Sequence, residues 1–192
     1  MDRSSVYEVF RDVGRDLFVS GSVSSHGGNL SVVSGDRILI TRRGAMLGRL
    51  AADDIVDTAL SEPDERAEEA SRELLVHRAI YEKTDAAAVC HAHPVHAIVR
   101  SLVCDEVVPI DSEGRFLLPR VPVFTFAMSI GSPDVAATVS AALREHRCVL
   151  VRGHGAFAAG STLDEAYQWV SVLEVSCRIL DLHEGLRLSP TD

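Results

Sequence analysis

Hydrophobic residues recur at helical spacing in several parts of the chain. Val6, Phe10, Val13 and Leu17 fall on one face of a helix that we expect to end near Val19. Ser5 and Glu8 have the spacing of a capping box, which marks the start of this helix. The other segments that favour helices are residues 67–82, 95–103, 133–145 and 162–184.

Short apolar runs bounded by turn residues predict the strands. Residues 29–33 and 37–41 flank the turn Ser34-Gly35-Asp36, which is typical of a hairpin. The acidic stretch 62–69 is interpreted as a solvated linker or a first helical turn. Mixed helices and strands with an early hairpin favour an α/β sandwich with a sheet that is at least partly antiparallel. The further predicted strands are residues 86–91, 116–124 and 147–152.

The composition is that of an ordinary globular protein. With 192 residues, 46% of them hydrophobic, we expect one domain spanning residues 1–192. The formal net charge of -9 argues against nucleic acid or an anionic membrane as a partner, because either requires a basic surface. We expect a cytoplasmic protein, since neither a signal peptide nor a membrane-spanning segment is apparent. The four cysteines are far apart and form no Cys-x-x-Cys pair, so buried free thiols are expected.

Two loops beside the predicted hairpin are rich in small residues. Gly28 and Asn29 lead into the strand at 29–33, and glycines allow main-chain amides to approach a bound anion. Thr41-Arg42-Arg43-Gly44 closes the next strand at the same end of the hairpin. Together the two loops predict an anion-binding cup, although a plain tight turn explains the first loop alone equally well.

Three histidines form the clearest candidate metal site. His91 and His93 end an apolar run, and His154 stands between glycines in Arg152-Gly153-His154-Gly155. Side chains alternate along a strand, so His91 and His93 share one face. Neutral imidazoles bind zinc, and three protein ligands leave a fourth position open, as in catalytic sites. Taken alone, a His-x-His pair is more often an ordinary pair of surface or core histidines.

A candidate acid/base precedes these histidines. Glu73 and His77 are four residues apart in the predicted helix, and Tyr81 continues the stripe, so all three can face one site. Taken alone, the pair of Glu73 and His77 is better explained as an exposed glutamate with a capping or core histidine. The order of the parts favours the functional interpretation: anion loops, a carboxylate on a helix, His-x-His and then Gly-His-Gly.

At this point the chain resembles the class II aldolase/adducin family, and its fuculose-1-phosphate aldolase-like members in particular. The resemblance spans nearly the whole chain and depends on the order and spacing of several short motifs. These are Gly28-Asn29-Leu30-Ser31, Thr41-x-x-Gly44, Ser71-x-Glu73-x-x-x-His77, Val89-Cys90-His91-Ala92-His93-Pro94-x-His96 and Arg152-Gly153-His154-Gly155-Ala156.

The resemblance implies a zinc-dependent aldolase. His91, His93 and His154 would bind one Zn²⁺ per subunit, and Glu73 would act as the acid/base. The implied reaction is reversible cleavage of a ketose 1-phosphate similar to fuculose 1-phosphate into dihydroxyacetone phosphate and an aldehyde, through an enediolate stabilised by the metal. The implied fold is a three-layer α/β sandwich with a central, mainly antiparallel sheet flanked by helices. Homotetramers with active sites between subunits are common in the family.

The second acid of the reaction is harder to place. Family members use a tyrosine or a glutamate about twenty residues after the first zinc histidine, often donated to a neighbouring subunit. This chain has no tyrosine there, and Glu113 is our choice with Asp111 in reserve. A simple polar turn is an equally good explanation of this segment.

The anion cup departs from the family pattern. Where relatives usually have small hydroxyl residues, this chain has His26, Arg43 and Arg72, and each change adds a potential cation. We infer that the cup still binds an anion but depends more on charge, with either a phosphate or a carboxylate as the ligand. The predicted substrate-binding residues are Gly28, Asn29, Arg43, Gly44, Ser71 and Arg72.

Three classes of function therefore remain open. The first is the aldolase described above. The second is a related enzyme that stabilises a similar charge: a pentulose-5-phosphate 4-epimerase, a methylthioribulose-1-phosphate dehydratase or a sugar-acid phosphate decarboxylase. The third is a non-enzymatic scaffold of the adducin type, which typically lacks the zinc histidines. Three imidazoles favour zinc, but manganese or cobalt can use the same ligands.

Overall fold

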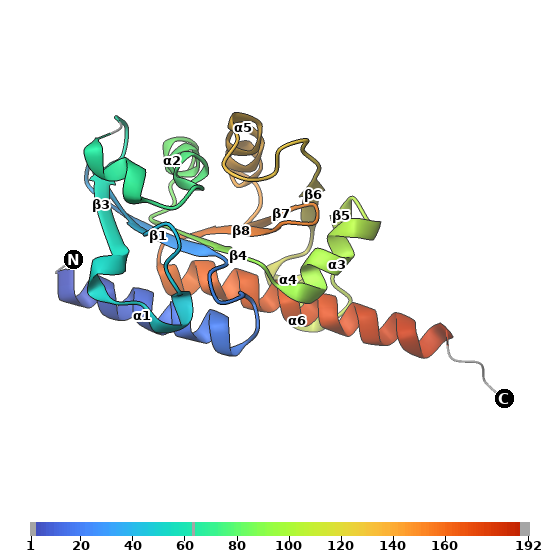
Figure 1. Ribbon diagram of the computed structural model, residues 1–192. Coiled ribbons are helices and arrows are strands. Elements are labelled where there is room, and N and C mark those ends of the chain that lie inside the picture. The colour runs from blue at the N-terminus through green and yellow to red at the C-terminus, as the bar shows by residue number, and fades with distance from the viewer. Residues whose placement is uncertain (1–2, 63, 189–192) are drawn as a thin grey trace.

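The computed structural model describes residues 3–62 and 64–188 (Figure 1). Within these residues the strands form one sheet of eight in the order β3-β2-β1-β4-β8-β7-β6-β5. All neighbouring strands are antiparallel except β6 and β7, which confirms the mainly antiparallel sheet that was predicted. The strands are β1 Asn29–Ser34, β2 Arg37–Thr41, β3 Ile55–Ala59, β4 Ala88–Ala92, β5 Glu106–Val107, β6 Val121–Phe124, β7 Cys148–Val151 and β8 Gly155–Gly160.

Helices cover both faces of this sheet. Helices α2 and α5 lie on one face, and α1 and α6 lie on the other (Figure 1). The helices are α1 Arg3–Val19, α2 Leu74–Lys83, α3 Val95–Val103, α4 Ser112–Leu117, α5 Pro133–Ala142 and α6 Leu163–Leu188, and 3-10 turns occur at Leu47–Arg49, Ala52–Asp54 and Glu65–Glu69. The predicted three-layer sandwich is thus confirmed.

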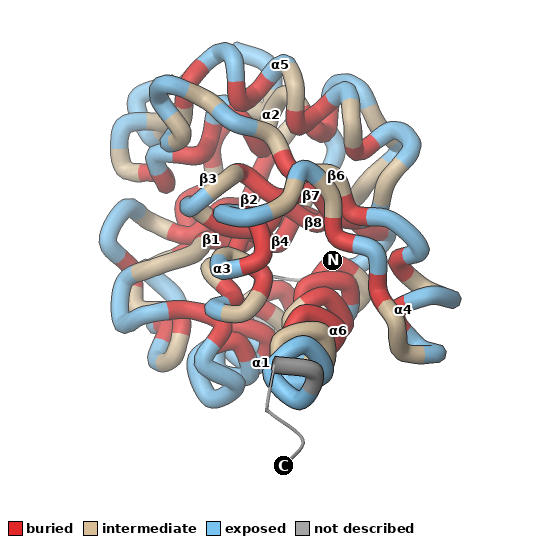
Figure 2. Tube along the Cα trace, turned by 90° about the vertical axis from the view of Figure 1, so that its right-hand side faces the viewer, coloured by how far each residue is buried: buried red, intermediate tan, exposed pale blue. Residues whose placement is uncertain are grey.

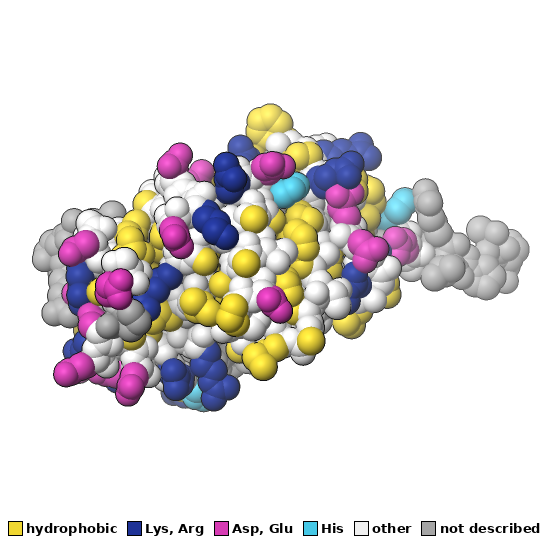
Figure 3. All heavy atoms as spheres, turned by 90° about the horizontal axis from the view of Figure 1, so that it is seen from above, with side chains coloured by type: hydrophobic (Ala, Val, Ile, Leu, Met, Phe, Trp, Pro, Cys, Tyr) yellow, Lys and Arg dark blue, Asp and Glu magenta, His cyan; other side chains and the backbone are white. Residues whose placement is uncertain are grey.

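Strand β4 shows how the alternating pattern builds the two cores. Cys90 packs into the core formed with α1 and α6, whereas Val89 packs into the core formed with α2 and α5. The central strands β4, β7 and β8 between them are buried almost throughout (Figure 2). Seen from the α2 and α5 side, the surface carries exposed hydrophobic side chains among charged ones (Figure 3). Helix α2 has an exposed hydrophobic residue in Leu75, and the loop between β6 and α5 has two in Met128 and Ile130.

The antiparallel order brings the predicted motifs to one end of the sheet. Asn29 at the start of β1 pairs with His91 near the end of β4, and Ala92 pairs with Ala156 near the start of β8. Strand β2 ends at this same end with Thr41. Segments that are far apart in the sequence therefore meet where β1 and β8 begin and β2 and β4 end.

The helix predicted at 67–82 starts later than expected, at Leu74. The preceding segment is tied to the end of β2 instead. The Ser71 amide donates to Thr41 O at 3.1 Å, and the Arg43 amide donates to Glu69 O at 2.9 Å. These bonds hold the main chain extended at Ala70, so a helix cannot form there. Within the predicted linker 62–69, residue 63 lies outside the described residues.

Other boundaries also differ from the prediction. The segment predicted as strand 116–124 starts as helix α4, because the Asp111 side chain caps that helix by accepting a hydrogen bond from the Gly114 amide. Strands β3, β5 and β8 were not predicted. The capping box at Ser5 and Glu8 is wrong, since α1 already includes Arg3.

The cysteines are free, with Cys90, Cys148 and Cys177 buried and Cys104 half-buried. No helix within the described residues is both long and apolar enough to cross a bilayer.

Candidate active site

The three predicted histidines meet at the end of the sheet. His91 belongs to β4, His93 directly follows it, and His154 lies in the turn between β7 and β8. One ligand atom of each lies within 4.8 Å of the others. His77 and His96 do not join this cluster. His77 is fully buried and bonds Ser31 Oγ at 2.6 Å, whereas His96 pairs with Asp181 at 2.5 Å.

The cluster has the chemistry of a divalent-metal site. His91 Nδ1 donates to Ala156 O at 2.9 Å, which leaves Nε2 as the free electron-pair donor. This Nε2 lies 3.1 Å from His93 Nε2, close to the roughly 3.3 Å that separates two nitrogens bound to one tetrahedral zinc ion. Burial lowers the pKa of all three rings, that of His93 to about 4, so they are neutral at pH 7 as ligands must be. The donor set therefore fits zinc.

A glycine allows the strands to approach closely beneath the histidines. A Cβ at Gly155 would lie 2.3 Å from Ala92 O and 2.7 Å from His93 Cδ2. Any larger residue would push β8 away from β4 and displace the His93 ring. Glycine is therefore needed at position 155 for the close packing of β8 against β4 and His93.

Glu73 lies beside the histidines at the N-cap of α2 and is 3% exposed. Its Oε2 accepts a hydrogen bond from the Gly131 amide at 3.1 Å. Its Oε1 has no hydrogen-bond partner among the described residues and lies 3.9 Å from His154 Nε2. Burial raises the pKa of the carboxyl to about 7, and the Gly131 bond partly offsets this effect. A carboxyl of this kind can both accept and release a proton near neutral pH.

The predicted stripe of Glu73, His77 and Tyr81 is wrong. Because Glu73 precedes the first turn of α2, it points into the cavity, whereas His77 and Tyr81 both bond Ser31 Oγ inside the protein. The His77 pKa falls to about 3 through burial. These two residues support the structure and do not reach the cavity.

Glu73 and the histidines line a cavity of about 310 Å³ with the two predicted anion loops. No carboxylate among the described residues forms an ion pair with Arg43 or Arg72, whereas the neighbouring Arg42 pairs with Glu69 at 2.7 Å. Asn29 is 6% exposed, and its Oδ1 has no partner within the described part of the chain. The lining residues from the predicted set are His26, Gly28, Asn29, Arg43, Gly44, Ser71, Arg72, Glu73, His91, His93 and His154.

The arrangement places positive charge and metal-type ligands in one cavity. Positively charged side chains without carboxylate partners attract an anion. A small molecule with an anionic group at one end could therefore contact the loops and the histidine cluster together.

Neither candidate for the second acid lines this cavity. Asp111 caps α4, and the neighbouring Glu113 is exposed in the first turn of that helix. The role of Glu113 stays a prediction, since such a residue is often donated to a neighbouring subunit's site.

Part of the cavity wall was not predicted from the sequence. Ile130 lines the cavity, and Gly131 holds Glu73. Nothing marked these residues in advance, because the loop at 125–132 contains no titratable side chain. Only the proximity of this loop to α2 in the folded chain reveals their role.

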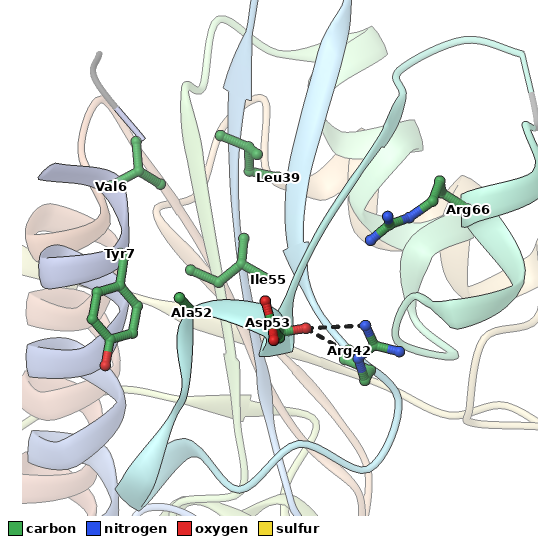
Figure 4. A pocket seen from close by; sticks show the side chains of 8 residues that line it. All are labelled: Val6, Tyr7, Leu39, Arg42, Ala52, Asp53, Ile55 and Arg66. Atoms are coloured by element: carbon green, nitrogen blue, oxygen red, sulfur yellow. Dashed lines mark hydrogen bonds between the residues drawn. The ribbon is translucent and has the colours of Figure 1, made fainter. Parts of the chain in front are cut away.

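A second cavity, of about 620 Å³, lies between α1 and the edge of the sheet (Figure 4). Arg42 and Arg66 point into it, but both pair with Glu69, and Arg42 also donates to Asp53 O. The other lining residues are largely apolar, and no histidine or cysteine is among the described residues that line this cavity.

Comparison with known proteins agrees with this arrangement. The family model of the class II aldolase and adducin N-terminal domain matches residues 8–180. The chain belongs to this family. The match confirms the resemblance found in the sequence motifs.

Individual relatives support the same conclusion. The chain is 29% identical over 180 residues to L-fuculose phosphate aldolase of Methanocaldococcus jannaschii, covering 93% of this chain and 95% of that protein. It is 32% identical over 181 residues to methylthioribulose-1-phosphate dehydratase of Acidiphilium cryptum, covering 86% and 85%. The crystal structure of L-fuculose-1-phosphate aldolase from Thermus thermophilus superimposes with a TM-score of 0.94 at 39% identity, covering 98% of this chain and 100% of that chain. The protein is thus an enzyme of the aldolase lyase type, as predicted.

Proposed function

We propose that the protein is a zinc-dependent aldolase that reversibly cleaves a ketose 1-phosphate, similar to fuculose 1-phosphate, into dihydroxyacetone phosphate and an aldehyde. The observation that carries this proposal is the joint presence of three neutral imidazoles, a buried carboxyl and uncompensated arginines in one cavity. Relatives named L-fuculose phosphate aldolase add support over almost the full length of the chain.

The histidines and Glu73 would have different roles in the reaction. His91, His93 and His154 would hold the metal, which acts as a Lewis acid toward negative charge that develops on substrate oxygens. Glu73 would move the proton, and its unpartnered Oε1 is the oxygen that faces the histidines. The Gly131 amide keeps the other oxygen in place, so the carboxyl is oriented before substrate binds.

The loops would bind the phosphate. Gly28, Asn29, Gly44 and Ser71 provide main-chain and side-chain donors, while Arg43, Arg72 and His26 contribute charge. In a chain with a net charge of -9, this local concentration of cations would direct an anionic substrate to the cavity.

The proposal predicts that Arg43→Ala raises KM about ten- to a hundred-fold for a phosphorylated substrate. The reason is the loss of charge-assisted hydrogen bonds that contribute on the order of 1.5–3 kcal/mol. Steady-state kinetics with the phosphorylated ketose and its unphosphorylated analogue would measure this effect, which should shrink with the analogue. Arg49→Ala is the matched control, because Arg49 is exposed but does not line the cavity. Equal losses with both substrates would rule out Arg43 as the residue that recognises the anion.

A methylthioribulose-1-phosphate dehydratase is the second candidate, and the 32% identical relative of that name favours it. Both enzymes would use the same metal ligands and the same anion loops. They differ in the bond that breaks, because the aldolase cleaves a carbon–carbon bond and the dehydratase removes water.

Product analysis would separate the two functions. The zinc-loaded protein would be incubated with a panel of ketose 1-phosphates, including methylthioribulose 1-phosphate, and products followed by mass spectrometry. Release of dihydroxyacetone phosphate supports the aldolase. A product lighter than its substrate by one water, with no released triose phosphate, would establish the dehydratase instead.

We further propose a homotetramer with one Zn²⁺ per subunit and active sites between subunits. In this assembly Glu113 of one subunit would serve as the second acid in the cavity of its neighbour. Its exposed position on α4 leaves it accessible to another chain. Light scattering on the purified protein would give the subunit count, and Glu113→Gln should lower turnover without lowering metal content.

A further inference from the structure

The turn that carries His154 is fastened to helix α3 by the side chain of Arg152. The guanidinium donates through Nε to Thr125 Oγ1 at 2.8 Å and through its terminal nitrogens to Ser101 O and the Asp105 carboxylate. Its side chain is 22% exposed, so these bonds are partly shielded from water. A single planar side chain thus joins the β7–β8 turn to the end of α3 and to the segment after β6.

The main chain of the turn is held at the same place. The Gly153 amide donates to Ser101 Oγ at 2.9 Å, and the Arg152 amide donates to Phe124 O at 2.8 Å. Ser101 is fully buried, and its hydroxyl donates in turn to Ile98 O at 2.6 Å. Gly153 has a φ of +67°, a conformation that a side chain would strain. The geometry of the turn is therefore fixed on both sides of Arg152.

The three histidines differ in how their backbones are held. His91 lies inside β4, with β1 and β8 on either side, and the His93 amide donates to Ser22 O at 2.8 Å. His154 lies outside both β7 and β8, in a turn between them. Its own amide bonds only within the turn, to Val151 O. Among the described residues, the main-chain hydrogen bonds that tie this turn to segments outside the hairpin are those of the Arg152 and Gly153 amides.

We propose that Arg152 and Ser101 are positioning residues that hold His154 where it completes the metal site. This inference rests on the metal site proposed above. Arg152 does not line the cavity, so it acts through the turn and not on the substrate. Groups that orient metal ligands from outside the coordination sphere typically change metal affinity by about 10- to 100-fold. Loss of the link would let His154 move away while His91 and His93 stay.

The test compares metal binding in Arg152→Ala, Arg152→Lys and Ser101→Ala with the unchanged protein. Affinity for Zn²⁺ and Co²⁺ would be measured by competition with a chromophoric chelator, and the Co²⁺ absorption spectrum would report the ligand geometry. We expect Arg152→Ala to bind metal about 10- to 100-fold more weakly with an altered Co²⁺ spectrum. Arg152→Lys should recover part of the affinity because it retains one contact. Ser101→Ala should show a smaller loss, since Arg152 remains.

Arg100→Ala is the matched control. Like Arg152, Arg100 on α3 is a largely buried arginine, but it pairs with Asp181 and Glu184 on α6 and with no residue of the turn that carries His154. Its loss should lower the melting temperature of the metal-free protein and leave the Co²⁺ spectrum unchanged. If the role of Arg152 were only structural, Arg152→Ala would likewise lower the melting temperature and leave the Co²⁺ spectrum unchanged.

Two outcomes would overturn the inference, and they can be told apart. If the unchanged protein binds no stoichiometric Zn²⁺ or Co²⁺, the metal site itself is wrong. If the unchanged protein binds metal and Arg152→Ala binds it equally well with the same spectrum, only the positioning role is wrong. Should Arg152→Ala not fold, the Ser101→Ala variant decides, because it removes the Gly153 bond and leaves the guanidinium in place.

Discussion

Glu73→Gln is expected to lower turnover by about two to four orders of magnitude while fold and metal content stay the same. The amide has nearly the same shape and can still accept the Gly131 hydrogen bond, but it cannot carry the proton. The variant should also be slightly more stable to unfolding than the unchanged protein near neutral pH. Burial disfavours the charged form of the Glu73 carboxyl, and the amide of the variant carries no charge. Steady-state kinetics and metal analysis on the same preparation would measure both quantities.

Glu69→Gln provides the control for this variant. Glu69 pairs with Arg42 and Arg66 and does not line the cavity, so its turnover should stay near that of the unchanged protein. Near-normal turnover in Glu73→Gln would remove this residue from the mechanism. A protein that loses its metal after the same change would show instead that Glu73 is a ligand.

The sequence predicted the position of the site better than the path of the chain around it. The three histidines were found because each lies next to a strong local signal, an apolar strand or a pair of glycines. Helix α3 at Val95–Val103 matches its prediction at both ends, since hydrophobic periodicity governs it. Local sequence patterns predict the structure correctly where contacts close in sequence determine it.

The errors occur where contacts between distant segments override the local pattern. Residues 67–73 have helix-forming side chains, yet bonds to the end of β2 keep them out of α2. This shift separates Glu73 from His77, which the helical spacing had placed on one face. Strand β8 was missed because Gly155–Gly160 is rich in glycine and alanine, and its position depends on pairing with β4 and β7.

The hydrogen bond from the Gly131 amide to Glu73 could not be predicted from local sequence patterns either. The Gly131 amide lies 58 residues away in sequence and carries no side chain that could mark it. A Cβ at Gly131 would lie 2.4 Å from Arg72 O, so the loop fits against the segment that precedes α2 only with glycine at this position. A main-chain donor of this kind is found only when the folded chain brings it to the carboxyl.

His154→Ala is expected to weaken metal binding by about two to three orders of magnitude and to reduce turnover to background. This loss follows from dividing the roughly 10–16 kcal/mol of a four-ligand zinc site among its ligands. The fold should survive, because His154 lies at the cavity surface and only partly packs against Phe157. Chelator competition, metal analysis and circular dichroism would measure the three properties.

His96→Ala is the matched control for the ligand variant. His96 is a partly exposed histidine whose Nδ1 bonds Asp181, so its removal takes away an imidazole outside the cluster. Metal affinity should stay unchanged, and only the contact between α3 and α6 should weaken.

In crystals grown with zinc, the ion should lie roughly 2.0–2.2 Å from a nitrogen of each of His91, His93 and His154, with a fourth position open. An ion bound by His77 or His96 in place of one of these three would contradict the assignment, because neither residue belongs to the group of His91, His93 and His154 whose ligand atoms lie within 4.8 Å of one another.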